Sequence, residues 1–324
     1  MSRISRVVVT GGAGFIGSWL ARELLGRGYS VIVLDNFCSG SWENLRGLHG
    51  KVGFKVVDGD VRDRHIVRKV MKDAEGVVHL AALIDVEASV RDPFETHDVN
   101  VNGTLNVLYE AVKAGVRRFV FASSTAVYGD ANPLPLKEDY PPRPISPYAA
   151  SKAAAEGYCL AFNKCYGLET VILRYFNVYG PGQRNSAYSG VITKFLENAL
   201  KGKPLTVYGD GCQTRDFIYV DDVIEATVLA LEDDGLEGET FNVCTGKPTS
   251  VNELVEVVRA ITGKDLKVVY DKLRKGDIRS NYGDPSKARK TLGFKAKTSL
   301  KEGIETIVNN LSDSSIRNMS FGLC

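Results

Sequence analysis

The stretch that decides the fold is Arg6-Val7-Val8-Val9-Thr10-Gly11-Gly12-Ala13-Gly14-Phe15-Ile16-Gly17. Its β-branched run is too continuous for a half-exposed strand and predicts a buried central strand of a parallel sheet. Residues 18–25 then carry helical periodicity as far as Gly26 and Gly28. A strand, a glycine turn and a helix in this order are typical of a dinucleotide site, because glycines let the backbone approach a pyrophosphate at a helix N-terminus. A glycine pattern alone also fits a flexible turn, but this context favours the site.

A second apolar strand, residues 30–34, ends at Asp35. This is about the distance from the glycines at which an acid binds the hydroxyls of the adenosine ribose. Since a carboxylate there repels a 2′-phosphate, the sequence predicts NAD rather than NADP. The alternative is that Asp35 is a turn residue that ends the strand before Asn36.

Further strand-and-helix units follow in the first half of the chain. Apolar runs at residues 54–57, 76–80 and 118–121 each end in small or polar residues, as expected where a ligand crosses the carboxyl edge of a doubly wound sheet. Between the last two runs, residues 93–114 predict a helix that carries Asn100 and Asn102. Asn100 either caps or packs, or it forms a hydrogen bond near the cofactor.

The stretch Ser146-Pro147-Tyr148-Ala149-Ala150-Ser151-Lys152 predicts a second functional element. Ser146 before Pro147 is a helix start, and Tyr148 and Lys152 then lie one turn apart on one face. A fixed ammonium group favours the phenolate of a neighbouring tyrosine, and an oxidised nicotinamide adds a second positive charge. The pair therefore fits proton transfer beside a bound cofactor. The alternative is an ordinary exposed helix pair.

Composition and charge narrow the class of protein. A chain of 324 residues corresponds to roughly two domains. Its 44% hydrophobic and 25% charged residues are ordinary globular values. With a net charge of +2 and no long basic run, we expect no nucleic-acid partner and no membrane-surface partner. No apolar run approaches the ~18 residues of a membrane span.

Cysteine and histidine usage adds two expectations. The six cysteines have no paired spacing, which suits reduced thiols, and residues 1–10 lack the layout of a signal peptide, so we expect a cytoplasmic protein. The four histidines are equally dispersed, so we expect no metal.

Several motifs in order resemble those of the extended short-chain dehydrogenase/reductases. They are the glycine turn at 10–17, Asp60-Val61, His79-Leu80-Ala81-Ala82, Ser123-Ser124-Thr125-Ala126-Val127-Tyr128-Gly129 and Tyr148-Ala149-Ala150-Ser151-Lys152. Within that superfamily the chain is similar to the UDP-hexose 4-epimerases, from residue 3 to about residue 310. The resemblance implies a doubly wound parallel Rossmann-type sheet with a smaller α+β C-terminal substrate domain.

The resemblance also implies a reaction. Tyr148 takes the proton of the sugar 4-hydroxyl while hydride passes from C4 to a tightly bound NAD, and the 4-keto sugar turns over before it takes the hydride back. Ser124 matches the catalytic serine that binds the same oxygen, and Thr125 is expected to assist. Lys152 is expected to hold the nicotinamide ribose and the phenolate together.

Other site residues follow from the matched motifs. The expected cofactor contacts are Gly11, Gly14, Phe15, Ile16, Gly17, Asp35, Asn36, Ser39, Gly40, Asp60, Val61, Leu80, Ala81, Ala82, Asn100, Tyr148, Lys152 and Phe176. The expected substrate contacts are Ser124, Thr125, Tyr148, Asn177, Val191, Tyr208, Arg215, Arg274 and Asp277. Guanidinium groups match the oxygens of two phosphates, which suits Arg215 and Arg274, although an isolated arginine is usually a surface residue.

The neighbours of Ser124 bear on the reaction type. Related dehydratases place an Asp-Glu pair after the catalytic hydroxyl residue and related decarboxylases keep a glutamate, whereas this chain has Thr125 and Ala126. Without that carboxyl group, the extra proton transfer has no carrier, which favours plain epimerisation. The rivals are a UDP-uronate 4-epimerase, another nucleotide-sugar oxidoreductase, and a non-catalytic NAD-sensing binding protein.

The preferred sugar depends on positions that vary among the resembling enzymes. Asn281 stands where a large aromatic side chain tends to exclude N-acetyl groups, so we expect tolerance of plain and acetylated sugars. Asn185 and Tyr188 resemble residues of enzymes that act on UDP-N-acetylhexosamines. Ile84 and Val99 depart from the lysine and asparagine of some galactose epimerases.

Domain boundaries and assembly complete the expectations. Residues 1–175 are expected to bind NAD, with a segment at about 216–246 crossing back, and residues 176–311 mainly to bind the substrate. The tail, residues 312–324, matches no motif and is polar enough to be disordered. The helices that hold Asn100 and Tyr148 form a four-helix dimer contact in relatives, which suggests a homodimer.

Overall fold

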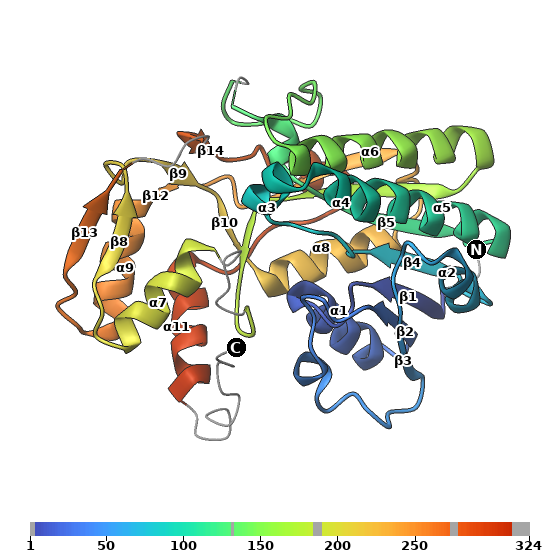
Figure 1. The fold of residues 1–324 in the computed structure, drawn as a ribbon, viewed down its shortest axis with the longest axis horizontal. Helices are drawn as coiled ribbons and strands as arrows, with labels where there is room; N and C mark the ends of the chain where they lie inside the picture. Colours follow the sequence, from blue (N-terminus) through green and yellow to red (C-terminus); the bar gives the residue numbers. More distant parts are fainter. Residues whose placement is uncertain (1–3, 131–132, 184–189, 273–277, 313–324) are drawn as a thin grey trace.

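A seven-stranded parallel sheet forms the larger part of the molecule (Figure 1). The computed structural model describes residues 4–130, 133–183, 190–272 and 278–312. The strands are β1 (Arg6–Thr10), β2 (Ser30–Asp35), β3 (Phe54–Asp58), β4 (Gly76–His79), β5 (Arg118–Ser124), β6 (Glu169–Tyr175) and β11 (Glu239–Val243). Their order is β11-β6-β5-β4-β1-β2-β3, with parallel pairing throughout. The chain order reverses between β1 and β4, which places a ligand crevice at their carboxyl ends.

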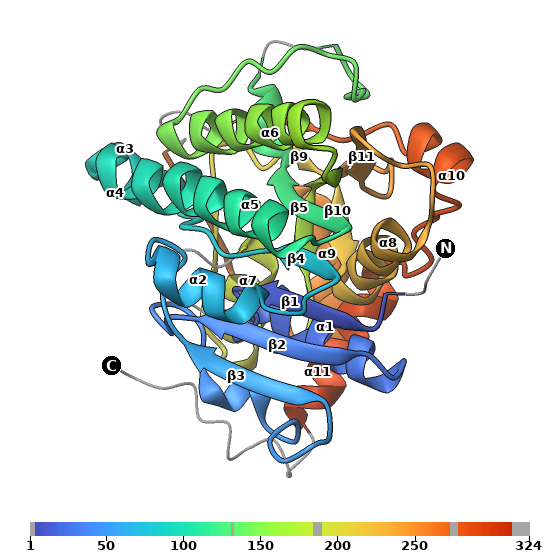
Figure 2. The same ribbon diagram turned by 90° about the vertical axis from the view of Figure 1, so that its right-hand side faces the viewer.

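Helices cover both faces of this sheet (Figure 2). One face carries α2 (Arg64–Met71), α3 (Val86–Arg91), α4 (Pro93–His97), α5 (Gly103–Ala114) and α6 (Pro147–Tyr166). The other face carries α1 (Phe15–Gly26) and α8 (Val220–Glu232). Successive residues of β1 serve opposite cores, because Val7 and Val9 pack in one buried cluster and Val8 in the other. This two-sided burial is the reason for the continuous apolar run, and the predicted doubly wound sheet is confirmed.

The helix predicted for residues 93–114 is interrupted. A π-helical turn, η2 (Asp98–Asn102), joins α4 to α5 and carries Asn100. Such turns insert one residue into the helical ladder and often occur at functional sites. Apolar periodicity cannot reveal one inserted residue, so the sequence indicated one continuous helix.

The smaller part of the molecule follows β6. It contains β7 (Asn177–Tyr179), α7 (Val191–Leu200), β8 (Leu205–Tyr208), β9 (Thr214–Arg215), β10 (Phe217–Tyr219), β12 (Thr249–Ser250), α9 (Val251–Thr262), β13 (Val268–Asp271), β14 (Ser280–Asn281), α10 (Ser286–Thr291) and α11 (Leu300–Ser312). These strands form three small sheets, β10-β7, β12-β9-β14 and β13-β8. The chain returns to the large sheet through α8, which packs on α1, and through β11, which pairs with β6.

One buried carboxylate ties the two parts together. Asp216 is fully buried and accepts hydrogen bonds from the backbone of Thr245 and Gly246 at 2.9 and 2.8 Å and from Gly283 at 3.3 Å. These segments carry the cavity-lining loops of the C-terminal part.

Among the described residues, none of the helices combines the length and apolarity that a membrane span requires. The tail from residue 313 onward lies outside the described residues, so its predicted disorder stays a prediction.

Candidate active site

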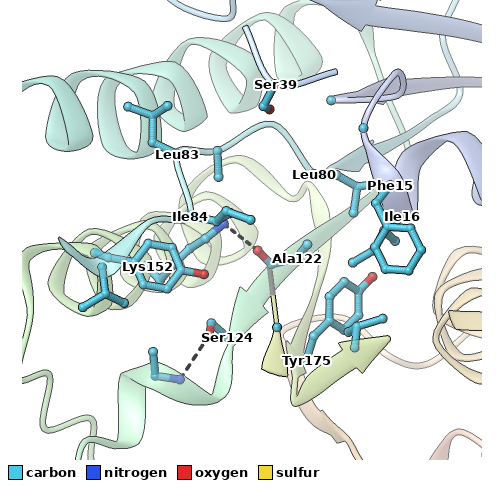
Figure 3. A pocket seen from close by; sticks show the side chains of 18 of the residues that line it. Phe15, Ile16, Ser39, Leu80, Leu83, Ile84, Ala122, Ser124, Lys152 and Tyr175 are labelled. Atoms are coloured by element: carbon cyan, nitrogen blue, oxygen red, sulfur yellow. Dashed lines mark hydrogen bonds between the residues drawn. The ribbon is translucent and has the colours of Figure 1, made fainter. Parts of the chain in front are cut away.

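A cavity of about 720 Å³ opens at the carboxyl edge of the large sheet (Figure 3). Most of the predicted site residues line it together. They are Gly11, Gly14, Phe15, Ile16, Gly17, Asp35, Asn36, Ser39, Asp60, Val61, Leu80, Ala81, Ala82, Ser124, Thr125, Tyr148, Lys152, Phe176, Asn177, Val191, Tyr208 and Arg215. The cavity therefore joins the glycine turn to the Tyr148 helix and to the C-terminal part.

The glycine turn forms one wall of the cavity. Gly11 adopts φ of 68°, and a Cβ at Gly17 would lie 2.3 Å from the Gly11 carbonyl oxygen, so both positions require glycine. Gly14 is the N-cap of α1 and has no side chain to occupy the first N–H groups of the helix. Phe15, Ile16 and Gly17 of this first turn line the cavity, and N–H groups at a helix N-terminus are donors for an anion, which fits the pyrophosphate of a dinucleotide.

Asp35 lies beside this turn, buried at the end of β2. Its Oδ2 accepts a hydrogen bond from the Ala13 amide and its Oδ1 one from the Phe37 amide, both at 2.8 Å. Burial raises the pKa of the carboxyl, and the two amides oppose that shift. Each carboxylate oxygen keeps a lone pair for a ribose hydroxyl.

Gly40 is not among the residues that line this cavity, and its expected cofactor contact stays a prediction. A Cβ there would lie 2.8 Å from Asp35 Oδ1 and 3.0 Å from the Ala13 backbone. Gly40 therefore leaves space for the carboxylate that does line it. The sequence alone cannot distinguish a glycine that touches a ligand from a glycine that touches another site residue.

Asp60 and Asn36 lie together on the cavity wall. Asn36 donates to Asp60 Oδ2 at 2.8 Å, and Arg62 forms a two-pronged pair with the same carboxylate at 2.7 and 3.0 Å. Arg62 lowers the pKa of Asp60 to about 2, so Asp60 is a charged acceptor at neutral pH. Arg62 also lines the cavity, and we did not predict it, because a single arginine after a strand is usually a surface residue.

Asn100 is buried outside the cavity lining, so the structure favours packing over a cofactor contact. Its Oδ1 accepts from the Leu83 amide at 2.8 Å, and its Nδ2 donates to the Leu83 carbonyl and to Ser151, both at 2.9 Å. All the hydrogen bonds of this amide therefore hold a cavity-lining loop against the Tyr148 helix.

The helix that carries Tyr148 and Lys152 begins as predicted. Ser146 is the N-cap of α6, and its hydroxyl accepts from the Ala149 amide at 3.1 Å. Lys152 is buried and donates to the Ala122 carbonyl at 2.8 Å (Figure 3). Its ammonium lies 4.9 Å from the centre of the Phe121 ring. Burial lowers the pKa of the Lys152 ammonium to about 8. This lysine is a fixed cation, and the exposed-pair alternative is wrong.

Tyr148 is also buried, and burial raises the pKa of its phenol. A hydrogen bond with the Ser124 hydroxyl opposes this shift, because it stabilises the phenolate. Ser124 is held by the Ala126 amide, which donates to its Oγ at 3.1 Å. Burial is the larger of the two effects, and a positive charge in the cavity would act in the same direction as Ser124.

Thr125 does not act alone on the cavity wall. Its hydroxyl donates to Oδ1 of the buried Asn281 at 3.0 Å, and both residues line the cavity. Because this proton is already used, Thr125 faces a ligand as a hydrogen-bond acceptor. Pairing across 156 residues is a tertiary result that the sequence does not reveal.

A buried ion pair joins the helix of Tyr148 to the strands beneath it. Glu156 accepts from Arg174 Nη2 at 2.7 Å and Nε at 2.9 Å, and from the Ser123 hydroxyl at 2.5 Å. Glu156 lies two turns after Tyr148, and Ser123 precedes Ser124. We did not single out either charged residue, although the spacing of Tyr148, Lys152 and Glu156 on one helix face was a usable signal.

Replacing Glu156 with leucine is expected to lower the free energy of unfolding by about 3–5 kcal/mol, because Arg174 is left as a buried charge without its carboxylate. Urea unfolding followed by circular dichroism measures this loss. The control is Glu225→Ala, which removes an exposed pair with Lys297 and should have a far smaller effect. Equal losses of unfolding free energy in the two variants would contradict a stabilising function of the buried Glu156–Arg174 pair.

The substrate side of the cavity contains Asn177, Val191, Tyr208 and Arg215. Arg215 donates to the Ile278 carbonyl at 2.7 Å, so it also supports the segment next to the expected Arg274 and Asp277. These two residues, like Asn185 and Tyr188, lie outside the described residues.

Gln213 lines the same side of the cavity, and we did not predict it. It is buried and donates to the Tyr208 carbonyl at 2.7 Å. The amide oxygens of Asn177 and Gln213 are buried and accept no hydrogen bond from the described residues. Such acceptors are normally paired in folded proteins, so a donor from another group suits this side of the cavity.

Within the described ranges, no three His, Cys, Asp or Glu side chains are grouped closely enough to hold a metal ion. The expected absence of a metal stays a prediction. The five cysteines in these ranges, Cys38, Cys159, Cys165, Cys212 and Cys244, are free thiols.

Comparison with known proteins shows which family has this sequence and fold. The family model for the NAD dependent epimerase/dehydratase family matches residues 7–244. A putative UDP-glucose 4-epimerase of Methanocaldococcus jannaschii is 44% identical over 305 residues, covering 94% of this chain and 97% of that protein. The crystal structure of UDP-glucose 4-epimerase with UDP-glucose from Thermotoga maritima superposes with a TM-score of 0.91 at 39% identity, covering 96% of this chain and 99% of that one.

Relatives with other chemistry are also similar. A UDP-N-acetyl-alpha-D-glucosaminuronate decarboxylase of Bacillus cytotoxicus is 34% identical over 315 residues, covering 94% of this chain and 96% of that protein. The comparisons thus identify the family without choosing the sugar. They confirm the resemblance to UDP-sugar 4-epimerases and the expectation of an NAD-dependent enzyme. The chain belongs to the NAD dependent epimerase/dehydratase family.

Proposed function

We propose that this protein catalyses the NAD-dependent 4-epimerisation of a UDP-hexose, through a transient 4-keto sugar. The observation that carries the proposal is that Tyr148, Ser124 and Lys152 line one cavity together with the glycine turn. The residues after Ser124 are Thr125 and Ala126, so that position has no carboxyl group for elimination or decarboxylation.

Each catalytic side chain has a distinct task in this reaction. Tyr148 as phenolate takes the proton of the sugar 4-hydroxyl and returns it when the alcohol is remade. Ser124 donates a hydrogen bond to the reacting oxygen, and Lys152 keeps a positive charge beside the phenolate. NAD, when bound, supplies the hydride acceptor and donor. The cofactor would be held by the glycine turn, Asp35, Asp60, residues 80–82, Lys152 and Phe176.

Product analysis tests the proposal. Purified protein is incubated with UDP-glucose, UDP-N-acetylglucosamine or UDP-glucuronate with a catalytic amount of NAD and no reductant, and the sugars are identified by NMR. We expect the 4-epimer of a hexose substrate to accumulate to equilibrium. Release of carbon dioxide, loss of water, or net formation of NADH in step with product would contradict it.

A binding protein on the same fold is the alternative of another class. Such a protein has no need for a buried cation beside a buried phenol, whereas both are present here. NAD binding without conversion of any UDP-sugar would favour that alternative. A UDP-uronate 4-epimerase would convert only the glucuronate.

The residue at position 281 supports tolerance of plain and acetylated hexoses. Asn281 is shorter than an aromatic residue and is held by Thr125. Ile84 and Val99 also line the cavity, so the two departures from galactose epimerases lie on its wall. We therefore propose UDP-glucose and UDP-N-acetylglucosamine as the sugars to compare first.

The cofactor preference gives a direct measurement. We expect NAD to bind at least about tenfold more tightly than NADP, because a 2′-phosphate would meet the buried Asp35 carboxylate with like charge. Titration calorimetry with each cofactor measures the two dissociation constants. In Asp35→Asn the ratio of the NADP and NAD dissociation constants should fall. Tighter binding of NADP than of NAD by the wild type would reject the preference for NAD.

Replacing Arg215 with alanine is expected to raise KM for the UDP-sugar by about 10- to 100-fold, because a charged hydrogen bond to phosphate is worth about 1.5–3 kcal/mol. Arg279→Ala is the control, since Arg279 is an exposed neighbour that pairs with Asp210 and does not line the cavity. Steady-state kinetics of both variants measure KM for the UDP-sugar. An unchanged KM in Arg215→Ala would exclude phosphate binding by this residue.

The remaining expectations are proposals about organisation. Residues 1–175, with the 216–246 segment, are proposed to bind NAD, and residues 176–311 mainly to bind the sugar nucleotide. A homodimer through α5 and α6 is supported by exposed apolar side chains on α4 and α6, Phe94, Tyr158 and Leu160. Sedimentation velocity tests it, and a monomer at micromolar concentration would reject it. The cytoplasmic location stays a prediction.

A further inference from the structure

His79 is the one buried histidine of the described residues, and it lies directly under the cavity wall. It ends β4, immediately before the cavity-lining residues Leu80, Ala81 and Ala82. Its Nδ1 lies 2.6 Å from Thr10 Oγ1 and its Nε2 lies 3.0 Å from Thr104 Oγ1. The ring itself does not line the cavity, so its function is exerted through its neighbours.

The neighbours decide which ring nitrogen carries the proton. The Thr104 hydroxyl donates to the Asn100 carbonyl at 2.6 Å, so Thr104 Oγ1 is an acceptor toward the ring. Nε2 therefore carries the hydrogen, and Nδ1 accepts from the Thr10 hydroxyl. Thr10 Oγ1 in turn accepts from the Ala81 amide at 3.3 Å. One directed chain of hydrogen bonds runs from Ala81 through Thr10, His79 and Thr104 to Asn100.

Other proton positions on the ring break this chain. With the hydrogen on Nδ1, the Thr10 hydroxyl hydrogen loses its acceptor, and Thr104 must abandon the Asn100 carbonyl to serve Nε2. With both nitrogens protonated, the Thr10 hydrogen again has no acceptor. Burial between Phe119 and Phe121, together with the nearby charge of Lys152, lowers the pKa of His79 to about 3. The ring therefore stays neutral near pH 7.

The two ends of the chain hold one segment of the cavity wall. At one end, Thr10 binds the Ala81 amide, and the Thr10 carbonyl accepts from the Leu80 amide at 3.1 Å. At the other end, the backbone of Asn100 receives Thr104 while its side chain binds both the amide and the carbonyl of Leu83. Residues 80–83 have no regular secondary structure, so these bonds fix their position.

We propose that His79, in its Nε2-protonated neutral form, is a positioning residue that holds the 80–83 segment in the shape that binds NAD. The ligand part of this proposal rests on the NAD site of the proposed function. The tautomer part rests on the hydrogen bonds alone, so the two parts can fail separately.

The first test reads the tautomer without any ligand. Imidazole ¹⁵N NMR of the wild type, with His79→Gln to assign the signal, distinguishes Nε2–H from Nδ1–H. We expect the Nε2–H form from pH 5 to pH 9 with no titration of His79. An Nδ1–H signal, or a His79 signal that titrates between pH 5 and pH 7, would overturn the proposal.

The second test measures NAD binding in Thr104 variants. Thr104→Val removes the acceptor for Nε2–H and is expected to weaken NAD binding by about tenfold, the size of one lost buried hydrogen bond. Thr104→Ser keeps the hydroxyl and should restore wild-type affinity and the wild-type tautomer. The control is Thr96→Val, because Thr96 is a buried threonine of α4 whose hydroxyl also binds a carbonyl one turn back.

The outcomes separate positioning from general stability. Thermal unfolding of all variants shows whether Thr104→Val merely loosens the fold. An unchanged NAD dissociation constant in Thr104→Val, or equal weakening in Thr96→Val, would overturn the proposal. A wild type that binds NAD with the Nε2–H tautomer but converts no UDP-sugar would contradict the proposed reaction and leave the positioning function intact.

Discussion

Replacing Tyr148 with phenylalanine is expected to lower kcat by a factor of about 10² to 10⁴, the usual contribution of a general acid–base group. The phenol is buried on the cavity wall beside the Ser124 hydroxyl, so deletion of its oxygen removes the proton acceptor without removing the ring. The packing of α6 should survive. The measurement is the initial rate of epimer formation under saturating UDP-sugar, together with the NAD content of the purified protein.

The matched control for Tyr148 lies on the same helix. Tyr158→Phe makes the same chemical change at a partly exposed position of α6 and should keep wild-type kcat. If Tyr148→Phe keeps more than about a tenth of wild-type kcat with full NAD content, another group moves the proton. Such a result would remove the basis of the proposed reaction.

Replacing Lys152 with methionine is expected to lower kcat by about 10²-fold or more, because the buried ammonium, one helical turn after Tyr148, is the cation proposed to stabilise the phenolate. Burial lowers the pKa of Lys152 to about 8. The ammonium is therefore present below that pH and is lost as the pH rises through it. The wild-type rate should fall above about pH 8, and the variant should lack this decline.

A second helix residue provides the control for Lys152. Lys164→Met removes an exposed lysine near the end of α6 and should change neither kcat nor its pH dependence. The measurement is kcat between pH 6 and pH 10 for all three proteins. If kcat of Lys152→Met also falls above pH 8, the loss of activity at high pH belongs to the titration of another group.

Motifs read from neighbouring residues predicted most of the fold and many of the residues that line the cavity. The glycine turn, Asp35 and the Ser146 helix start depend on contacts within a few residues, and the structure reproduces each of them. Strand ends in a doubly wound sheet meet at one edge, so Ser124 and the glycine turn were expected to share a cavity. The resemblance added the distant C-terminal contacts, of which Arg215 and Tyr208 line that cavity.

Three of the expected site residues have protein partners that local patterns did not reveal. Gly40 leaves space for the nearby Asp35 carboxylate, Asn100 holds Leu83, and Thr125 donates its proton to Asn281. The Glu156–Arg174 ion pair was also missed, because the helix spacing that could have singled out Glu156 does not show that its partner is Arg174 on β6.

By itself, the sequence determined the layer architecture and the glycine turn and indicated Tyr148 and Lys152 as candidates for proton transfer, because these depend on short-range periodicity, glycine conformation and side-chain chemistry. Only the tertiary structure decided how the hydrogen bonds of Asn100, Thr125 and His79 are used. A polar side chain that is withdrawn from water must find a partner wherever the folded chain places one, and that partner can lie more than a hundred residues away.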